Sequence, residues 1–219
     1  KRKMALIPRV AAWGYSQIGA RIEGDTNVDF KNPKLIAEIK DTMDYTFQVL
    51  EGLCSEPVKY IRYIPPVGFL QLAELKLYED AELKEEIKIT PVTDFPNIER
   101  VVDGDILSYV YRESQGVIKP LVFALDSSRQ VKSLYYIART DDNYVWEGDM
   151  YELLYFDGEK GWKPLGVKTA VSKHISFDAP GNALLWLRNR TKGKEEQVFI
   201  YKNNRQWFNS DFNTCGQCK

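Results

Sequence analysis

An acidic and aromatic segment near the middle of the chain holds the residue types that recognise sugars. Aromatic rings stack on the C–H face of a sugar, and planar polar groups bind its hydroxyls. These types are concentrated in residues 141–149, and a further tryptophan follows the Gly-x-x-Gly turn at residues 158–161. The alternative is a solvated turn with an aromatic side chain folded into the core. The predicted carbohydrate-binding residues are Tyr144, Trp146, Asp141, Asp142, Asn143 and Trp162.

The segment Asp103-Gly104-Asp105 places two carboxylates on either side of a glycine. Calcium takes about six to eight oxygen ligands in proteins, many of them from carboxylates. The glycine permits a tight turn that brings the two acids together, and Glu195 or Glu196 on a later strand can add a third. We therefore predict a structural Ca²⁺ held by Asp103, Asp105 and Glu196. A plain turn with solvated charges is the alternative.

Groups for catalysis are much less evident. The sole histidine, His174, lies in a strand-like segment with no serine or cysteine motif near it, so a nucleophilic triad is unsupported. Cys215 and Cys218 form a C-x-x-C motif in the last five residues, without the helix start of a redox site or the further ligands of a zinc site. We expect no enzymatic activity, and a flexible tail at residues 209–219.

Composition excludes some partners. The net charge of -1 gives no electrostatic reason to expect nucleic acid as a partner. No run of about 18 apolar residues is present, so we do not expect the chain to span a membrane. The thirteen tyrosines favour sheets over helical bundles.

Many short runs alternate between apolar and polar residues or are rich in β-branched and aromatic residues, which is typical of strands. Residues 34–40 fit a strand or a single helical turn. Turns recur every eight to twelve residues or so, which predicts an all-β sandwich. The clearest predicted strands are residues 59–64, 70–78, 121–125, 134–138, 151–156, 183–187 and 197–201.

An internal repeat indicates two modules, because residues 4–80 and 134–203 can be laid over each other strand by strand. Residues 85–133 precede the second copy and have no counterpart ahead of the first. We therefore predict modules at 1–82 and 83–208, the first incomplete at its N-terminus. Its missing strands are expected from residues upstream of Lys1, from the second module or from a partner chain, since an open sheet would expose unpaired backbone.

Two segments resemble discoidin domains, the coagulation-factor type C family of galactose-binding-like jelly rolls. Tyr60–Tyr63 followed by Ala73–Tyr78 resembles the end of such a domain, and Val102–Asp105 resembles a loop near its start. Ser108 and Tyr109 stand where the family has Thr and Trp. Residues 139–155 and 183–196 resemble C-terminal modules of secreted Bacteroidetes proteins, which often follow a transglutaminase-like or glycan-processing domain.

The resemblance implies two jelly-roll-type β-sandwich modules in an exported protein, in the periplasm, on the cell surface or secreted. It implies a non-catalytic carbohydrate-binding or adhesion function, with a glycan or glycoprotein surface and an upstream domain of the same polypeptide as partners. The alternative is a pair of structural accessory domains that supports an upstream catalytic domain.

Overall fold

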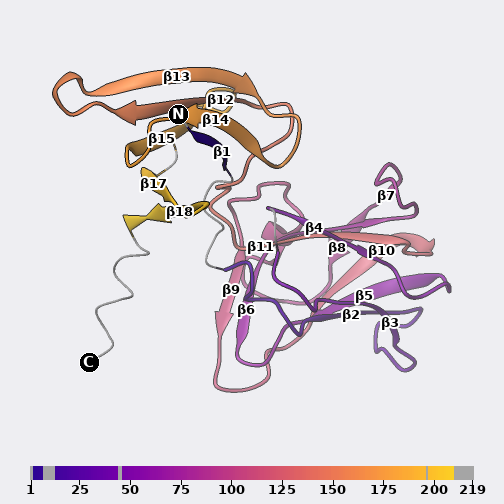
Figure 1. Cartoon of the computed structure of the whole chain (residues 1–219). Coiled ribbons are helices and arrows are strands. Elements are labelled where there is room, and N and C mark those ends of the chain that lie inside the picture. Colours follow the sequence, from indigo (N-terminus) through magenta and orange to yellow (C-terminus); the bar gives the residue numbers. More distant parts are fainter. Residues whose placement is uncertain (1, 7–12, 44–45, 196, 210–219) are drawn as a thin grey trace. The chain divides into compact units, whose positions relative to one another are not determined.

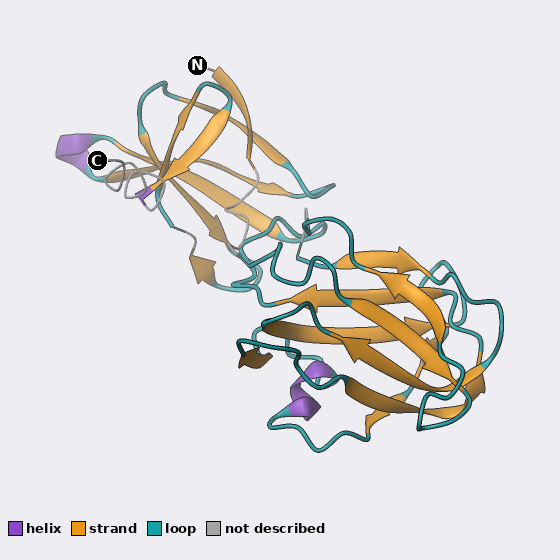
Figure 2. Cartoon of the chain, turned by 90° about the horizontal axis from the view of Figure 1, so that it is seen from below, coloured by secondary structure: helices purple, strands orange, loops and turns teal. Residues whose placement is uncertain are grey.

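A computed structural model of the chain describes residues 2–6, 13–43, 46–195 and 197–209. Strands and loops make up nearly all of it (Figures 1 and 2), with two short 3₁₀ turns, η1 (Ile98–Val101) and η2 (Gly158–Lys160). All strand pairs are antiparallel, and none of the described sheets closes into a barrel. The all-β prediction is confirmed. Residues 34–40, which fitted strand and helix equally, contain a strand, β3 (Lys34–Glu38).

The chain divides into two compact units, a larger one of Ala11–Asp142 and a smaller one of Lys1–Val10 with Asn143–Lys219. The larger unit has two sheets. The first contains β2 (Arg21–Asp25), β3, β5 (Val58–Ile64), β8 (Ile89–Pro91) and β10 (Leu121–Arg129), in the order β3-β2-β5-β10-β8. The second contains β4 (Gln48–Glu51), β6 (Phe69–Tyr78), β7 (Glu86–Ile87) and β11 (Ser133–Ala138), in the order β4-β11-β6-β7, with β9 (Val110–Glu113) also paired to β6.

One hydrophobic core joins these two sheets. Ile61 and Phe123 from the first sheet and Leu72, Leu134 and Tyr136 from the second are all buried in the same cluster. Burial of each such side chain stabilises the fold by about 1.5–3 kcal/mol. The larger unit is therefore β-sandwich-like, because the inner faces of both sheets share one core.

The division of the chain differs from the predicted boundary at residues 82 and 83. β5 pairs with β10, and β6 pairs with β11, so strands from both sides of that boundary share each sheet. Residues 86–138 thus supply the strands that the sequence predicts to be missing from the first module. β11 also belongs to the larger unit, so residues 134–203 do not form one module as the repeat predicts. Sequence spacing does not reveal such long-range pairing.

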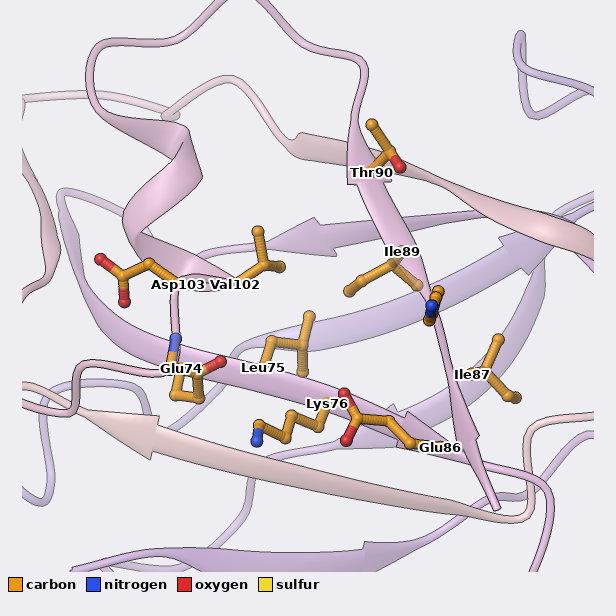
Figure 3. A pocket seen from close by; sticks show the side chains of 11 residues that line it. Glu74, Leu75, Lys76, Glu86, Ile87, Ile89, Thr90, Val102 and Asp103 are labelled. Carbon is orange, nitrogen blue, oxygen red and sulfur yellow. The ribbon is translucent and has the colours of Figure 1, made fainter.

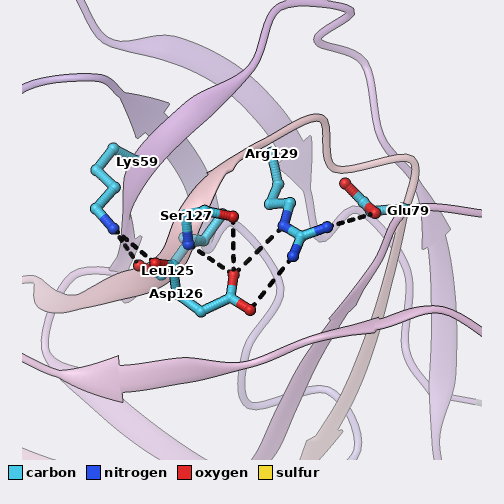
Figure 4. Close-up of polar contacts among 6 residues, drawn as sticks. All are labelled: Lys59, Glu79, Leu125, Asp126, Ser127 and Arg129. Atoms are coloured by element: carbon cyan, nitrogen blue, oxygen red, sulfur yellow. Dashed lines mark hydrogen bonds and ion pairs between the residues drawn. The ribbon is translucent and has the colours of Figure 1, made fainter.

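A bulge in β10 is held by charged side chains (Figure 4). The register between β10 and β5 shifts between Ala124 and Arg129. The ammonium of Lys59 donates to the carbonyls of Leu125 and Asp126, at 2.7 and 3.1 Å. Carbonyls at a bulge lose their partners in the ladder, so these bonds replace the missing ones.

The smaller unit has a six-stranded sheet and a two-stranded sheet. The order of the larger sheet is β13-β12-β15-β17-β18, with β16 also paired to β15. Its strands are β12 (Met150–Phe156), β13 (Trp162–Thr169), β15 (Leu184–Asn189), β16 (Lys194–Glu195), β17 (Phe199–Lys202) and β18 (Arg205–Phe208). The smaller sheet pairs β1 (Arg2–Leu6) with β14 (Ile175–Ala179).

The alternation of β12 is confirmed, because Tyr151 and Leu153 enter the core of this unit while Phe156 is exposed. β12 also pairs on both sides and is not an edge strand. Among the helices of the described ranges, none combines the length and apolar character that crossing a bilayer requires.

Candidate binding site

The larger unit contains a pocket of about 580 Å³ that combines aromatic, amide and guanidinium groups. We call it the Arg139 pocket. Its lining residues are Trp13, Gln71, Asn97, Arg100, Tyr109, Tyr111 and Arg139.

Strand pairing positions the floor of the Arg139 pocket. Gln71 on β6 lies directly opposite Tyr111 on β9 in the antiparallel register. Opposed residues in a ladder project from the same face of the sheet, so these two side chains are neighbours. Arg139 directly follows β11, and its backbone N–H donates to the carbonyl of Gln71 at 3.2 Å. Asn97 and Arg100 come from the turn η1, where Asn97 adopts a left-handed backbone with φ of 59°.

The guanidinium of Arg139 contacts two aromatic rings. Its Cζ is 3.8 Å from the centre of the Trp13 ring and 4.7 Å from the centre of the Tyr109 ring. Each cation–π contact of this kind contributes about 0.5–2 kcal/mol, depending on how far it is desolvated. Two such contacts on one guanidinium restrict where the Arg139 side chain can lie.

Gln71 brings a buried polar group to the Arg139 pocket. The residue is 3% exposed, and its Oε1 has no hydrogen-bond partner among the described residues. Leaving a buried acceptor unpaired costs about 1–3 kcal/mol. The oxygen is itself covered by protein atoms, so a ligand hydroxyl recovers that free energy only when the Gln71 side chain turns toward the pocket. The site can therefore bind a compact polar ligand with an apolar face.

The predicted calcium loop lies beside a second pocket, of about 350 Å³ (Figure 3). Asp103 and Asp105 are both exposed. Asp103 accepts hydrogen bonds from the Asp105 N–H at 2.8 Å and from the Ser108 hydroxyl at 2.7 Å. The described ranges contain no group of three or more metal-binding side chains, and Glu196 lies outside them. Calcium binding stays a prediction.

Glu74 on β6 lies under this loop. It is 1% exposed, and one of its carboxyl oxygens accepts a hydrogen bond from the Gly104 N–H at 3.0 Å. Figure 3 shows the Asp103 side chain pointing away from it. Burial raises the pKa of Glu74 to about 7, although Lys76 and the Gly104 N–H act in the opposite direction.

The predicted sugar-binding residues do not form a single site within either unit. Asp141 and Asp142 end the larger unit, whereas Asn143, Tyr144 and Trp146 begin the smaller one. Tyr144 is 1% exposed, which leaves no ring face for a sugar.

The other predicted residues vary in exposure. Asp142 is buried and Asp141 is exposed, while Asn143 and Trp146 are half-buried. The ring of Trp146 lies 4.4 Å from the ammonium of Lys192. Trp162 lies in β13, where its ring contacts Phe156 at 5.5 Å and Trp186 at 5.4 Å.

Sequence reasoning missed the Arg139 pocket because its residues form no local motif. Trp13, Gln71 and Arg139 are separated by more than fifty residues each, and the pairing of β6 with β9 and β11 brings Gln71, Tyr111 and Arg139 together. One local signal was present, since Tyr109 and Tyr111 alternate ahead of a polar run, as residues on one face of a strand do.

Comparisons of the chain with protein-family models, with curated proteins and with solved structures found no match.

Proposed function

We propose that the chain is a non-catalytic carbohydrate-binding or adhesion module of an exported bacterial protein, and that the sugar binds in the Arg139 pocket. The observation that carries this proposal is the guanidinium of Arg139 in contact with the rings of Trp13 and Tyr109, in a pocket that Gln71 also lines.

The chemistry of the pocket suits a sugar ring. Trp13 and Tyr111 supply aromatic surface for the C–H face, and the amides of Gln71 and Asn97 supply donors and acceptors for hydroxyls. The volume of about 580 Å³ falls within the range of about 300–1,000 Å³ that is usual for small-ligand sites. Both kinds of group needed for sugar recognition are therefore together in one place.

We further propose that the larger unit is a galactose-binding-like jelly roll. The two segments of the discoidin resemblance, Ala73–Tyr78 and Val102–Asp105, are in contact through the bond between Gly104 and Glu74. They belong to the same sandwich, although the segment that resembles the end of such a domain comes earlier in the chain than the segment that resembles its start. The smaller unit would then be a second β-sandwich module. The same resemblance is the reason for proposing that the protein is exported and carries a domain upstream of these two units.

A structural calcium at Asp103 and Asp105 is part of this proposal. A carboxylate has about four lone-pair positions, so the two hydrogen bonds that Asp103 accepts leave oxygen capacity for a cation. The exposure of the loop gives an ion access from solvent.

Calorimetric titration of the purified chain with a panel of oligosaccharides tests the proposed function. Trp13→Ala should lower the affinity about tenfold or more, the equivalent of losing ~1.4 kcal/mol of ring contacts. Trp162→Ala serves as the matched control, because it removes a half-buried tryptophan from the other unit and should leave the affinity unchanged.

If no sugar of the panel binds, the sugar-binding proposal fails and the accessory structural role gains support. Loss of binding in Trp162→Ala but not in Trp13→Ala would place the site where the sequence predicts it. Melting temperatures of both variants within a few degrees of the unmodified chain would exclude unfolding as the cause.

A further inference from the structure

The Arg139 pocket has an excess of positive charge. Arg100 and Arg139 line it, while none of its lining residues is an aspartate, a glutamate or a histidine. The whole chain carries a net charge of -1, so this excess is local. Guanidinium groups do not lose their proton in proteins, and the two charges therefore repel each other at every pH at which the protein is folded.

Neither arginine is neutralised by a carboxylate of the described residues. Within the described part of the chain, Arg100 and Arg139 make no ion pair with a carboxylate. Arg100 donates only a long hydrogen bond of 3.5 Å to the carbonyl of Tyr109. Glu113, on β9, accepts a hydrogen bond of 2.9 Å from the hydroxyl of the lining residue Tyr111 and is itself exposed.

The guanidinium of Arg139 favours a planar anion. Its contacts with the rings of Trp13 and Tyr109 hold it in the lining of the pocket. A guanidinium presents parallel N–H donors that match the two oxygens of a carboxylate. Hydroxyls of a neutral sugar would fill the same space and leave both positive charges uncompensated.

We propose that the ligand of the Arg139 pocket is a sugar ring that bears an anionic substituent, with a uronic-acid carboxylate as the group that fits best. This rests on the proposed function and specifies its ligand class. The aromatic rings and the Gln71 amide hold the ring, and the two arginines bind the anion.

A comparison of uronic-acid oligosaccharides with their methyl esters separates charge from ring shape. The ester keeps the ring and its hydroxyls and removes only the charge. The free acid should bind about tenfold or more tighter than the ester, and its affinity should fall as salt rises. Arg100→Gln should reduce the preference for the acid without abolishing it, because Arg139 still binds the carboxylate.

Arg112→Gln is the matched control. It removes the same charge from β9, one residue beyond Tyr111 and outside the pocket lining, and should preserve the preference for the acid.

A sulfated sugar in the panel tests whether a sulfate group can replace the carboxylate. Binding as tight as that of the uronic acid supports an anionic sugar in general.

Two results would overturn the inference, and only one of them would also overturn the proposed function. Equal affinity for acid and ester would refute the anionic ligand while leaving sugar binding in place. Binding of neither, nor of any neutral sugar, would refute the inference together with the proposed function.

Discussion

The backbone N–H of Gly104 donates a hydrogen bond of 3.0 Å to the carboxyl group of Glu74. This bond fastens the Asp103 loop to the middle of β6 and leaves Glu74 buried, with a pKa raised to about 7 mainly by that burial. The ordinary value for this carboxyl is 4.5.

The raised pKa makes stability depend on pH. A carboxyl whose pKa is higher in the folded state favours folding when it is neutral, so its contribution is complete below about pH 4.5 and is lost as pH rises through about 7. Glu74→Gln keeps an acceptor for Gly104 and cannot ionise. Relative to the unmodified chain, this variant should gain on the order of 3 kcal/mol of unfolding free energy between pH 4.5 and pH 8.

Urea unfolding at several pH values, with chelator present to remove cations, measures that difference. A difference between variant and unmodified chain that stays constant from pH 4.5 to pH 8 would show that Glu74 does not titrate in this range.

Calcium should raise the melting temperature if it binds the Asp103 loop, because a ligand of the native state stabilises it by mass action. Asp103→Ala should abolish the response to added calcium, whatever its effect on stability without the ion. Asp94→Ala, which removes an exposed acid outside the loop, should preserve the response. Melting that is indifferent to calcium and chelator in the unmodified chain would refute the site.

Gly52, directly after β4, has no room for a side chain. A Cβ there would lie 2.1 Å from the carbonyl oxygen of Val131, a backbone atom that cannot rotate away. Gly52→Ala should therefore destabilise the larger unit by about 1–3 kcal/mol or more. At Gly116 a Cβ would meet nothing within 4 Å, so Gly116→Ala should change stability by about 0.5 kcal/mol or less. Equal effects of the two substitutions on urea unfolding would contradict this packing.

The strands were predictable because their signals are local. The β-branched and aromatic run at residues 134–138 gives β11, the alternation over residues 151–156 gives β12, and the apolar run at 121–125 gives the start of β10. Their partners were not predictable, because β5 finds β10 across more than fifty residues of intervening chain. The repeat assigned residues 134–138 to the second module on spacing alone, whereas pairing with β4 and β6 places them in the larger unit.

The candidate site was less predictable than the fold. Gln71 is a polar residue within the predicted strand at residues 70–78, and no local pattern indicates that it is buried opposite Tyr111. Tyr144 reads as part of a polar loop and is buried. Burial of single side chains in loops depends on tertiary contacts, which no local pattern encodes.

The five tryptophans of the chain allow the central claim to be tested by one measurement. Each indole N–H gives its own signal in a ¹H–¹⁵N NMR spectrum, and a titration with a binding oligosaccharide reports which ring the sugar touches. We expect the Trp13 signal to move with saturation, together with the side-chain amide signals of Gln71. Movement of the Trp146 or Trp162 signal, with Trp13 unchanged, would contradict binding in the Arg139 pocket.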